Sequence, residues 1–390
     1  MAHDFDKLVN EYKQIGNKYI RFFESDKKLV LFGASQLGSE ISQHLKGNAI
    51  AIDLFCDNDK NKCQKHFQDI FVIPFDVLCS IKDEIKIIIT SRWYYQIKAQ
   101  LDAAGFEDIL DYGYEPFIKI FGYPHPHHYP AVFSKYKLLR KRTDIVSSNL
   151  DKIKEVYELF EDDLSKDTFY NIMKYRMTYD SKYIYNISEC VHYYFNNNFL
   201  QFSDDEVLID AGAYIGDSIY DFIKHTDGRF RKIYSFEPSI INYSHLVSNK
   251  NMLPYPHKLA FVHAAIGNQN GHVEFFNNPR SAGYSGSRIS DYSKGCISND
   301  TVPIVKLDDY NFSEKITFIK MDIEGAEIDA LKGSERILKT IMPKLAISVY
   351  HKPDDILEVP LLIKRINNNY KIYLRAKYPY YEKETVCYAV

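Results

Sequence analysis

The segment Val207–Gly216, VLIDAGAYIG, decides the fold of this 390-residue chain. An apolar run ends at Asp210, Gly212 and Gly216 then bracket a tight turn, and a helical pattern follows. This order predicts a strand, a turn and a helix. Glycine at position 212 lets the backbone approach a bound molecule, and the free N–H groups of the following helix favour an anionic group. We therefore predict that this turn binds a ligand.

A second acidic residue follows the turn at a spacing typical of nucleotide-binding folds. Lys232–Phe236 is predicted to be the next strand, and Glu237 ends it, 21 residues after Gly216. A carboxylate at this strand end accepts hydrogen bonds from both ribose hydroxyls. Because Tyr214 occupies the middle glycine position of the dinucleotide motif, the turn instead resembles the first motif of S-adenosylmethionine (SAM) methyltransferases.

Length, charge and cysteine usage limit the class of protein. The length suits two domains of about 150 to 200 residues each. A net charge of −3 and a pI near 6.5 disfavour a nucleic-acid partner. No apolar run approaches the roughly 18 residues that span a bilayer, and the first residues lack a signal-peptide core. The six cysteines include no C-x-x-C pair, which favours reduced thiols. We predict a cytoplasmic protein without a membrane span.

A smaller α/β domain is predicted over residues 27–121, after an amphipathic helix over residues 1–26. Its signals are the glycine turn Gly33–Gly38 and a second strand that leads to Asp57. GASQLGSEI, FCDNDK, IPFDVL, IIITS and LDAAGF resemble the nucleotide-binding-like domains of bacterial sugar-modifying enzymes. Ser35 replaces the second glycine of the dinucleotide motif, which disfavours tight NAD binding. A structural or dimerising domain is the alternative.

Residues 122–200 are predicted to form a linker and a helical connector. The stretch GYPHPHHYP is broken by proline, so we favour a surface linker over a metal site for its three histidines. Helices are predicted at Tyr136–Arg142, Asp151–Glu161, Thr168–Met177 and Glu189–Phe195, with Tyr193, Tyr194 and Phe195 as core residues.

The alternation of strands and helices continues over residues 201–390. Strands are predicted at Phe261–Ile266, Thr317–Met321 and Leu345–Val349, and YKIYLRAKY with ETVCYAV is predicted to close the sheet as a hairpin with an antiparallel last strand. The Gly/Ser-rich loop Arg280–Ser290 is predicted to be a lid.

The motifs IDAGAYIGDS, FEP, AAIGN, HVEFF, KLDDY, FIKMDIEGAEIDALKG and ETVCYAV together resemble the FkbM-type family of SAM-dependent O-methyltransferases. This resemblance implies an α/β fold of the class I methyltransferase type, with a Rossmann-like parallel sheet and an antiparallel last strand. It also implies SAM as donor and methyl transfer to oxygen, often on a carbohydrate or natural product. The implied cofactor contacts are Asp210, Gly212, Ala213, Tyr214 and Gly216 at the methionine end, Glu237 at the ribose, and Ala265 and Ile266 at the adenine.

The catalytic candidates follow the fourth and fifth strands of this domain. The carboxyl ends of these strands face the ligand crevice, which places Asp322 beside the transferred methyl group. An alcohol needs a base, or a metal ion that lowers its pKa, before it attacks. Asp322 or Glu324 suits either role, with His351 as base or ligand, and Mg²⁺ held by Asp322 stays an open alternative. A helix cap at Glu324 and a loop position for His351 are the structural alternatives.

We therefore predict a SAM-dependent O-methyltransferase for a hydroxyl of a sugar, nucleotide sugar or sugar-linked metabolite, in polysaccharide or natural-product biosynthesis. In this hypothesis the Gly33–Gly38 turn holds the phosphates of a nucleotide sugar, and Asp57 holds its ribose. The alternatives are a non-catalytic nucleotide-sugar binding or scaffold protein, and a dehydrogenase that uses the first domain. The absence of an N-P-P-Y-type motif disfavours a nucleic-acid base methyltransferase, and a homodimer is left open.

Overall fold

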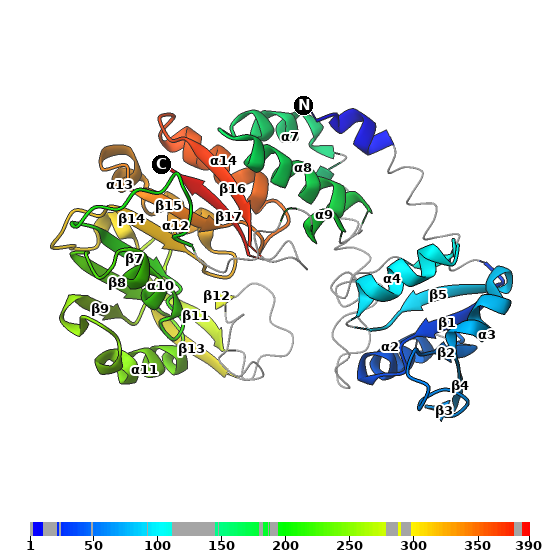
Figure 1. Ribbon diagram of the computed structural model, residues 1–390. Coiled ribbons are helices and arrows are strands. Elements are labelled where there is room, and N and C mark those ends of the chain that lie inside the picture. The colour runs from blue at the N-terminus through cyan, green and yellow to red at the C-terminus, as the bar shows by residue number, and fades with distance from the viewer. Residues whose placement is uncertain are drawn as a thin grey trace. The chain divides into compact units, whose positions relative to one another are not determined.

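The computed structural model describes residues 3–10, 22, 25–47, 50–91, 93–110, 145, 146, 148–178, 182–185, 187, 194–277, 288, 289, 298–377 and 384–390 (Figure 1). The chain divides into two compact units, residues 1–150 with 170–186 and residues 151–169 with 187–390. The predicted linker GYPHPHHYP, the predicted helix Tyr136–Arg142, most of the helix Glu189–Phe195 and most of the predicted lid lie outside the described residues. Of the predicted N-terminal helix, residues 5–10 are described and are helical.

The first unit contains a sheet with apolar clusters on both faces. Its elements are β1 (Lys28–Phe32), α2 (Gln36–Gly47), β2 (Leu54–Cys56), β3 (His66–Phe67), β4 (Ile70–Ile73), α3 (Phe75–Ser80), η1 (Lys82–Glu84), β5 (Ile85–Ile89), α4 (Tyr94–Ala103) and β6 (Ile109–Leu110). The strand order is β3-β4-β2-β1-β5-β6, and β3 is antiparallel to β4 while the other pairs are parallel.

The β1 strand shows why both faces of this sheet are covered. Leu29 and Leu31 pack in one cluster with residues of α2, whereas Val30 and Phe32 pack in the other with residues of α4. Successive side chains of a strand point to opposite faces, so a strand that is apolar throughout needs a layer on each side. The predicted Rossmann-like architecture is thereby confirmed.

Helices α7 (Leu150–Glu158), α8 (Asp163–Thr178) and α9 (Lys182–Tyr185) agree with the predicted helical connector, although α8 begins earlier than expected. The start of α8 is set by Asp162, which accepts a hydrogen bond from the Ser165 N–H at 2.8 Å. Arg375 holds the other oxygen of Asp162 at 2.6 Å. Among the described residues, no helix is long and apolar enough to cross a membrane.

The second unit contains a seven-stranded sheet in its described part, in the order β16-β17-β15-β14-β7-β8-β9. Its strands are β7 (Val207–Ala211), β8 (Lys232–Phe236), β9 (Leu259–Val262), β14 (Phe318–Met321), β15 (Lys344–Ser348), β16 (Ile372–Ala376) and β17 (Thr385–Ala389). β17 runs antiparallel to both β15 and β16, which confirms the predicted closing hairpin. From β7 the chain proceeds to one side through β8 and β9, and β14 returns on the other side of β7. In open α/β sheets such a switch point opens a ligand crevice at the carboxyl ends of the strands.

The remaining elements of this unit are helices and a second, smaller sheet (Figure 1). The helices are α10 (Asp217–His225), α11 (Ile240–Asn249), η2 (Lys250–Met252), η3 (Pro256–Lys258), η4 (Leu307–Asp309), α12 (Glu327–Lys332), α13 (Glu335–Thr340) and α14 (Asp355–Ile366). A second sheet has the order β10-β13-β11-β12, from β10 (Ala265–Ile266), β11 (Gly271–Asn277), β12 (Arg288–Ile289) and β13 (Ser298–Val305). The prediction of one strand over Phe261–Ile266 was wrong, because β9 pairs with β8 whereas β10 pairs with β13.

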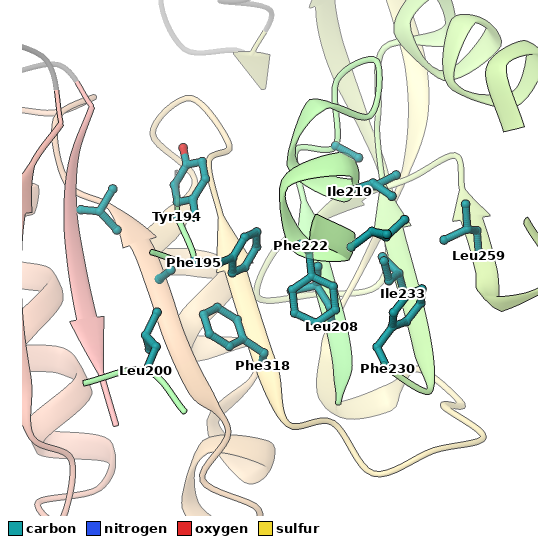
Figure 2. Packing of buried hydrophobic residues seen from close by; sticks show 14 of the residues in the cluster. Tyr194, Phe195, Leu200, Leu208, Ile219, Phe222, Phe230, Ile233, Leu259 and Phe318 are labelled. Carbon is teal, nitrogen blue, oxygen red and sulfur yellow. The ribbon is translucent and has the colours of Figure 1, made fainter. Parts of the chain in front are cut away.

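An aromatic cluster fills the space between the sheet and the residues that precede β7 (Figure 2). The Phe195 ring lies 5.0 Å from the ring of Phe222 and 5.3 Å from that of Phe318, between ring centroids. Figure 2 shows Tyr194 at the edge of this cluster, with its hydroxyl directed away from the other labelled side chains. Phe195 and Tyr194 both belong to this buried cluster, as predicted, and the hydroxyl of Tyr194 donates to Asp322.

The backbone of Gly212 generates a first prediction. Its φ is +77°, and a Cβ at this position would lie 1.9 Å from the carbonyl oxygen of Asp322. We expect Gly212→Ala to lower the free energy of unfolding by about 2 to 4 kcal/mol, because a left-handed backbone and a steric overlap each cost free energy. Denaturant unfolding followed by circular dichroism measures this loss.

Gly271→Ala is the control for this variant. Gly271 also has a positive φ, +150°, but no atom lies within 4 Å of an added Cβ. We expect a clearly smaller loss there. Equal losses would show that backbone conformation alone, rather than contact with Asp322, requires the glycine.

Candidate functional site

A pocket of about 380 Å³ opens at the switch point between β7 and β14, within the size range of small-molecule sites. It lies wholly within the second unit. Of the predicted site residues, its lining includes Gly212, Tyr214, Glu237, Ala265, Ile266, Asp322 and Glu324. The structure therefore brings most of the predicted cofactor and catalytic residues to one cavity.

The turn after β7 is held by the neighbouring strand end. The N–H groups of Gly212 and Ala213 both donate to the carbonyl of Phe236, at 3.0 and 3.1 Å. Ala213 is buried, and a Cβ added at Gly216, where φ is +103°, would lie 3.1 Å from the side chain of Leu246. Neither residue is in the pocket lining. The sequence explained Gly212 by the approach of a ligand, whereas its missing Cβ faces the backbone of Asp322.

Glu237 lies at the carboxyl end of β8, as predicted, and is 5% exposed. Its Oε2 accepts from the Tyr214 N–H at 2.8 Å, and its Oε1 accepts from the Ser239 N–H at 2.9 Å. Burial raises the pKa of Glu237 to about 7, against the opposing effect of these hydrogen bonds. A carboxylate offers about four acceptor positions, and Oε1 also accepts from Asn242 Nδ2 at 3.5 Å, so the position that remains for a ligand is on Oε2.

Asp210 lies beneath the turn rather than in the pocket lining. Its Oδ1 is 3.0 Å from the Nζ of Lys320, and these side chains are 0% and 2% exposed. Lys320 also donates to the carbonyl of Gly212 at 2.9 Å. Burial alone lowers the pKa of Lys320, but the carboxylates of Asp210, Asp322 and Asp217 outweigh it and raise that pKa. A charged lysine therefore joins the turn to β14.

Asp322 is the residue on which the polar groups of the site converge. Tyr194 donates to its Oδ2 at 2.8 Å, and Tyr350 donates to its Oδ1 at 3.1 Å. Burial raises the pKa of Asp322, but His351, Lys320 and the two tyrosine hydroxyls outweigh it and hold the pKa below its usual value. Asp322 is therefore an ionised, oriented carboxylate at the edge of the pocket.

His351 lies beneath Asp322 and is surrounded by carboxylates. Its Nε2 is 3.3 Å from Asp322 and 3.6 Å from Glu324, and its Nδ1 is 2.9 Å from the buried Glu327. Burial lowers the pKa of His351, but the carboxylates, led by Glu327, raise it to about 9. Glu324 lies in the turn before α12 with φ +55°. The alternative of a helix cap at Glu324 is wrong, because the N-cap of α12 is Ala326.

Comparison with known proteins identifies this unit. The family model "Methyltransferase FkbM domain" matches residues 210–372, a range that holds Asp210, Glu237, Asp322 and His351. The second unit carries a methyltransferase FkbM domain. The resemblance inferred from the sequence motifs is thereby confirmed, and the domain is that of a methyltransferase.

A solved structure confirms the fold of this chain. It is similar to the crystal structure of methyltransferase FkbM from Methylobacillus flagellatus KT, with a TM-score of 0.70, 22% identity, and coverage of 99% of this chain and 100% of that one. A more distant match is SMU.1697c from Streptococcus mutans in complex with SAH, with a TM-score of 0.30, 12% identity, and coverage of 47% and 89%. A comparison with curated proteins gave no match.

Several residues of the methyltransferase pocket were not predicted. Tyr194, Lys320, Tyr350 and Glu384 are in its lining, and Glu327 supports it from beneath. Lys320 had a sequence signal, because a lysine within the apolar run FIKM of a buried strand needs a nearby acid. Burial raises the pKa of Glu384 to about 7. No local pattern marks Tyr194, which comes from the segment before β7.

In the glycine turn of the first unit, the acidic residue Asp57 binds groups of the protein itself. Asp57 Oδ2 accepts from the Ala34 N–H at 2.9 Å and lies 3.0 Å from the Nζ of Lys62. A Cβ at Gly38 would lie 2.1 Å from the carbonyl oxygen of Gly33. These contacts stabilise the turn itself, so nucleotide binding there stays a prediction.

The buried ion pair beneath the methyltransferase pocket generates a second prediction. We expect Lys320→Met to lower the free energy of unfolding by about 3 to 5 kcal/mol, because it leaves the carboxylate of Asp210 buried without its partner. Lys339→Met is the control, since Lys339 pairs with Glu335 on the surface, where both side chains are about half exposed; it should cost less than about 1 kcal/mol. A small loss in Lys320→Met would show that the lysine is dispensable for the turn.

Proposed function

We propose that this protein is a SAM-dependent O-methyltransferase that acts on a hydroxyl of a sugar, nucleotide sugar or sugar-linked metabolite. The observation that carries the proposal is one pocket, in a methyltransferase domain, with a ribose-type carboxylate at Glu237 and an oriented carboxylate at Asp322. The first suits a nucleoside, and the second suits an alcohol.

The residues that line the pocket fit SAM in their hydrogen-bonding groups, apolar side chains and charge. Glu237 would accept a hydrogen bond from a ribose hydroxyl through the remaining lone pair of Oε2. Ile266 and Phe275 supply apolar lining for the adenine. Acidic groups outnumber ammonium groups in the lining, which favours a cationic ligand. Beside Lys320 lie Asp217, Asp322 and Glu324, together with Glu237 and Glu384, whose pKa values of about 7 leave them partly ionised at neutral pH.

Asp322 would orient the acceptor and take its proton. When bound, SAM supplies a methyl group on a positively charged sulfur. Two tyrosine hydroxyls and His351 contact the carboxylate of Asp322. Since a carboxylate has about four acceptor positions, one remains for a substrate hydroxyl. Asp322 would accept the hydroxyl proton as the methyl group is transferred to that oxygen. A carboxylate of low pKa suffices, because a protonated ether is far more acidic.

His351 would hold Asp322 in place. It would not act as a base, because its raised pKa keeps the imidazole protonated. With Glu327 behind it, the imidazole fixes the orientation of the carboxylate. The carbohydrate acceptor is supported by the resemblance of the first unit to domains of sugar-modifying enzymes. A nucleotide sugar would give that unit a function, with its nucleotide at the Gly33–Gly38 turn and Asp57.

Binding of SAM and its product S-adenosylhomocysteine (SAH) is expected to depend on pH through Glu237. Since the pKa of Glu237 is about 7, the carboxyl is protonated below that pH and loses acceptor capacity for the ribose. We expect affinity for SAH to rise as pH increases through 7 and to level off above it. Calorimetry over this pH range measures the effect.

Glu237→Gln provides the matched control for this titration. It should weaken SAH binding at high pH by about 1.5 to 3 kcal/mol, the range for a lost charged hydrogen bond, and it should remove the pH dependence. Glu335→Gln, on the surface of α13, should change neither. The ribose is held elsewhere if Glu237→Gln binds SAH as the wild type does.

Asp322 is expected to matter for turnover more than for cofactor binding. Asp322→Asn should keep SAH affinity within a few-fold and slow methyl transfer by about a hundredfold or more, because the amide cannot accept the proton. Mass spectrometry of methylated sugar and nucleotide-sugar acceptors measures the rate. Asp329→Asn, an exposed carboxylate of α12, is the control. Full turnover in Asp322→Asn would contradict this role.

A further inference from the structure

One ring nitrogen of His351 has a hydrogen-bond partner, and the other has none. Glu327 Oε1 accepts from the Ile323 N–H at 3.0 Å and lies 2.9 Å from His351 Nδ1. Because this oxygen acts as an acceptor, the contact assigns the proton to Nδ1. His351 is 8% exposed, and its Nε2 is buried without a hydrogen-bond partner. A buried ring nitrogen is thus directed at the edge of the pocket, and a metal ion bound there would replace the proton that Nε2 carries in the protonated imidazole.

Two carboxylates lie near His351 Nε2, at distances that suit ligands of one metal ion. Nε2 is 3.3 Å from Asp322 Oδ1 and 3.6 Å from Glu324 Oε2. A charged hydrogen bond from nitrogen to a carboxylate measures about 2.7 to 2.9 Å. Ligands bonded to one ion at about 2.0 to 2.2 Å, at angles of 90° to 109°, lie roughly 2.8 to 3.6 Å apart. Both contacts are longer than such hydrogen bonds and fit the edges of a coordination polyhedron.

The backbone at Glu324 supports the same interpretation. Glu324 has φ +55° and precedes Gly325 with φ +98°. A left-handed conformation of a residue other than glycine costs free energy and is found most often where function requires it. Among the described residues, Asp322 and His351 belong to a group whose ligand atoms lie within 4.8 Å of one another, and its third member is Glu327 rather than Glu324.

We propose that His351 Nε2, Asp322 and Glu324 form a site for one divalent transition-metal ion, with Glu327 orienting the imidazole from behind. Metal-bound histidines usually donate their other N–H to a carboxylate, as His351 does. The imidazole favours Mn²⁺, Fe²⁺ or Zn²⁺ over the Mg²⁺ that carboxylates alone would suggest. Asp322 and Glu324 line the pocket, so the remaining coordination positions face it. The role of the ion in binding an acceptor hydroxyl rests on the proposed methyltransferase function, whereas the site does not.

Direct titration of the full chain with Mn²⁺ tests the site without any turnover. After treatment with chelator, the signal of free Mn²⁺ in electron paramagnetic resonance should show one bound ion per chain. His351→Ala should weaken binding at least tenfold, and Glu327→Gln should weaken it about ten- to hundredfold. Glu335→Gln, with an exposed carboxylate outside the pocket, should bind Mn²⁺ as the wild type does.

Calorimetry with SAH on the same samples separates this proposal from the proposed function. A wild-type chain that binds SAH but neither Mn²⁺ nor Zn²⁺ overturns the metal site and leaves the methyltransferase proposal standing. Unchanged Mn²⁺ affinity in His351→Ala also overturns it. Should His351→Ala not fold, the isosteric variants Asp322→Asn and Glu324→Gln decide, since both must weaken Mn²⁺ binding. Mn²⁺ binding without SAH binding supports the site and contradicts the proposed function.

Discussion

The buried ion pair between Lys320 and Asp210 is the interaction on which the candidate site depends. The two residues are direct partners in the pairing of β14 with β7, and both are fully enclosed. A buried charge is tolerated only when it is paired and hydrogen-bonded, and Lys320 completes its bonding at the carbonyl of Gly212. One side chain thereby joins the two strands of the switch point to the turn that borders the pocket.

Charge compensation continues outward from this pair to the surface of the pocket. Asp322 follows β14 and receives hydrogen bonds from Tyr194 and Tyr350, which come from distant parts of the sequence. His351 stands between Asp322 and Glu327, and the carboxylates of this cluster exceed the cations beside them. The site therefore attracts positive charge, which agrees with the proposed sulfonium cofactor and the proposed metal ion.

Both units use one arrangement at their glycine turns, with different results. Asp57 accepts from the backbone N–H of Ala34, and Glu237 accepts from that of Tyr214, at 2.9 and 2.8 Å. Asp57 also pairs with the ammonium of Lys62. Glu237 instead lines the pocket and is so buried that its pKa rises to about 7. The same backbone contact stabilises a turn in the first unit and leaves a carboxylate that lines the pocket in the second.

The sequence by itself determined the local elements of this protein: the strand–turn–helix at Val207–Gly216, the acid at Glu237, the strand that ends at Asp322 and the closing hairpin. These elements follow from the spacing of apolar residues, the positions of glycines and the residues at strand ends, all of which are properties of short segments. Only the tertiary structure decided that β9 and β10 belong to different sheets, that Asp210 lies beneath the pocket, and that Tyr194 reaches Asp322. These outcomes depend on which distant segments pack together and on how buried charges find partners, and a short stretch of sequence carries no record of either.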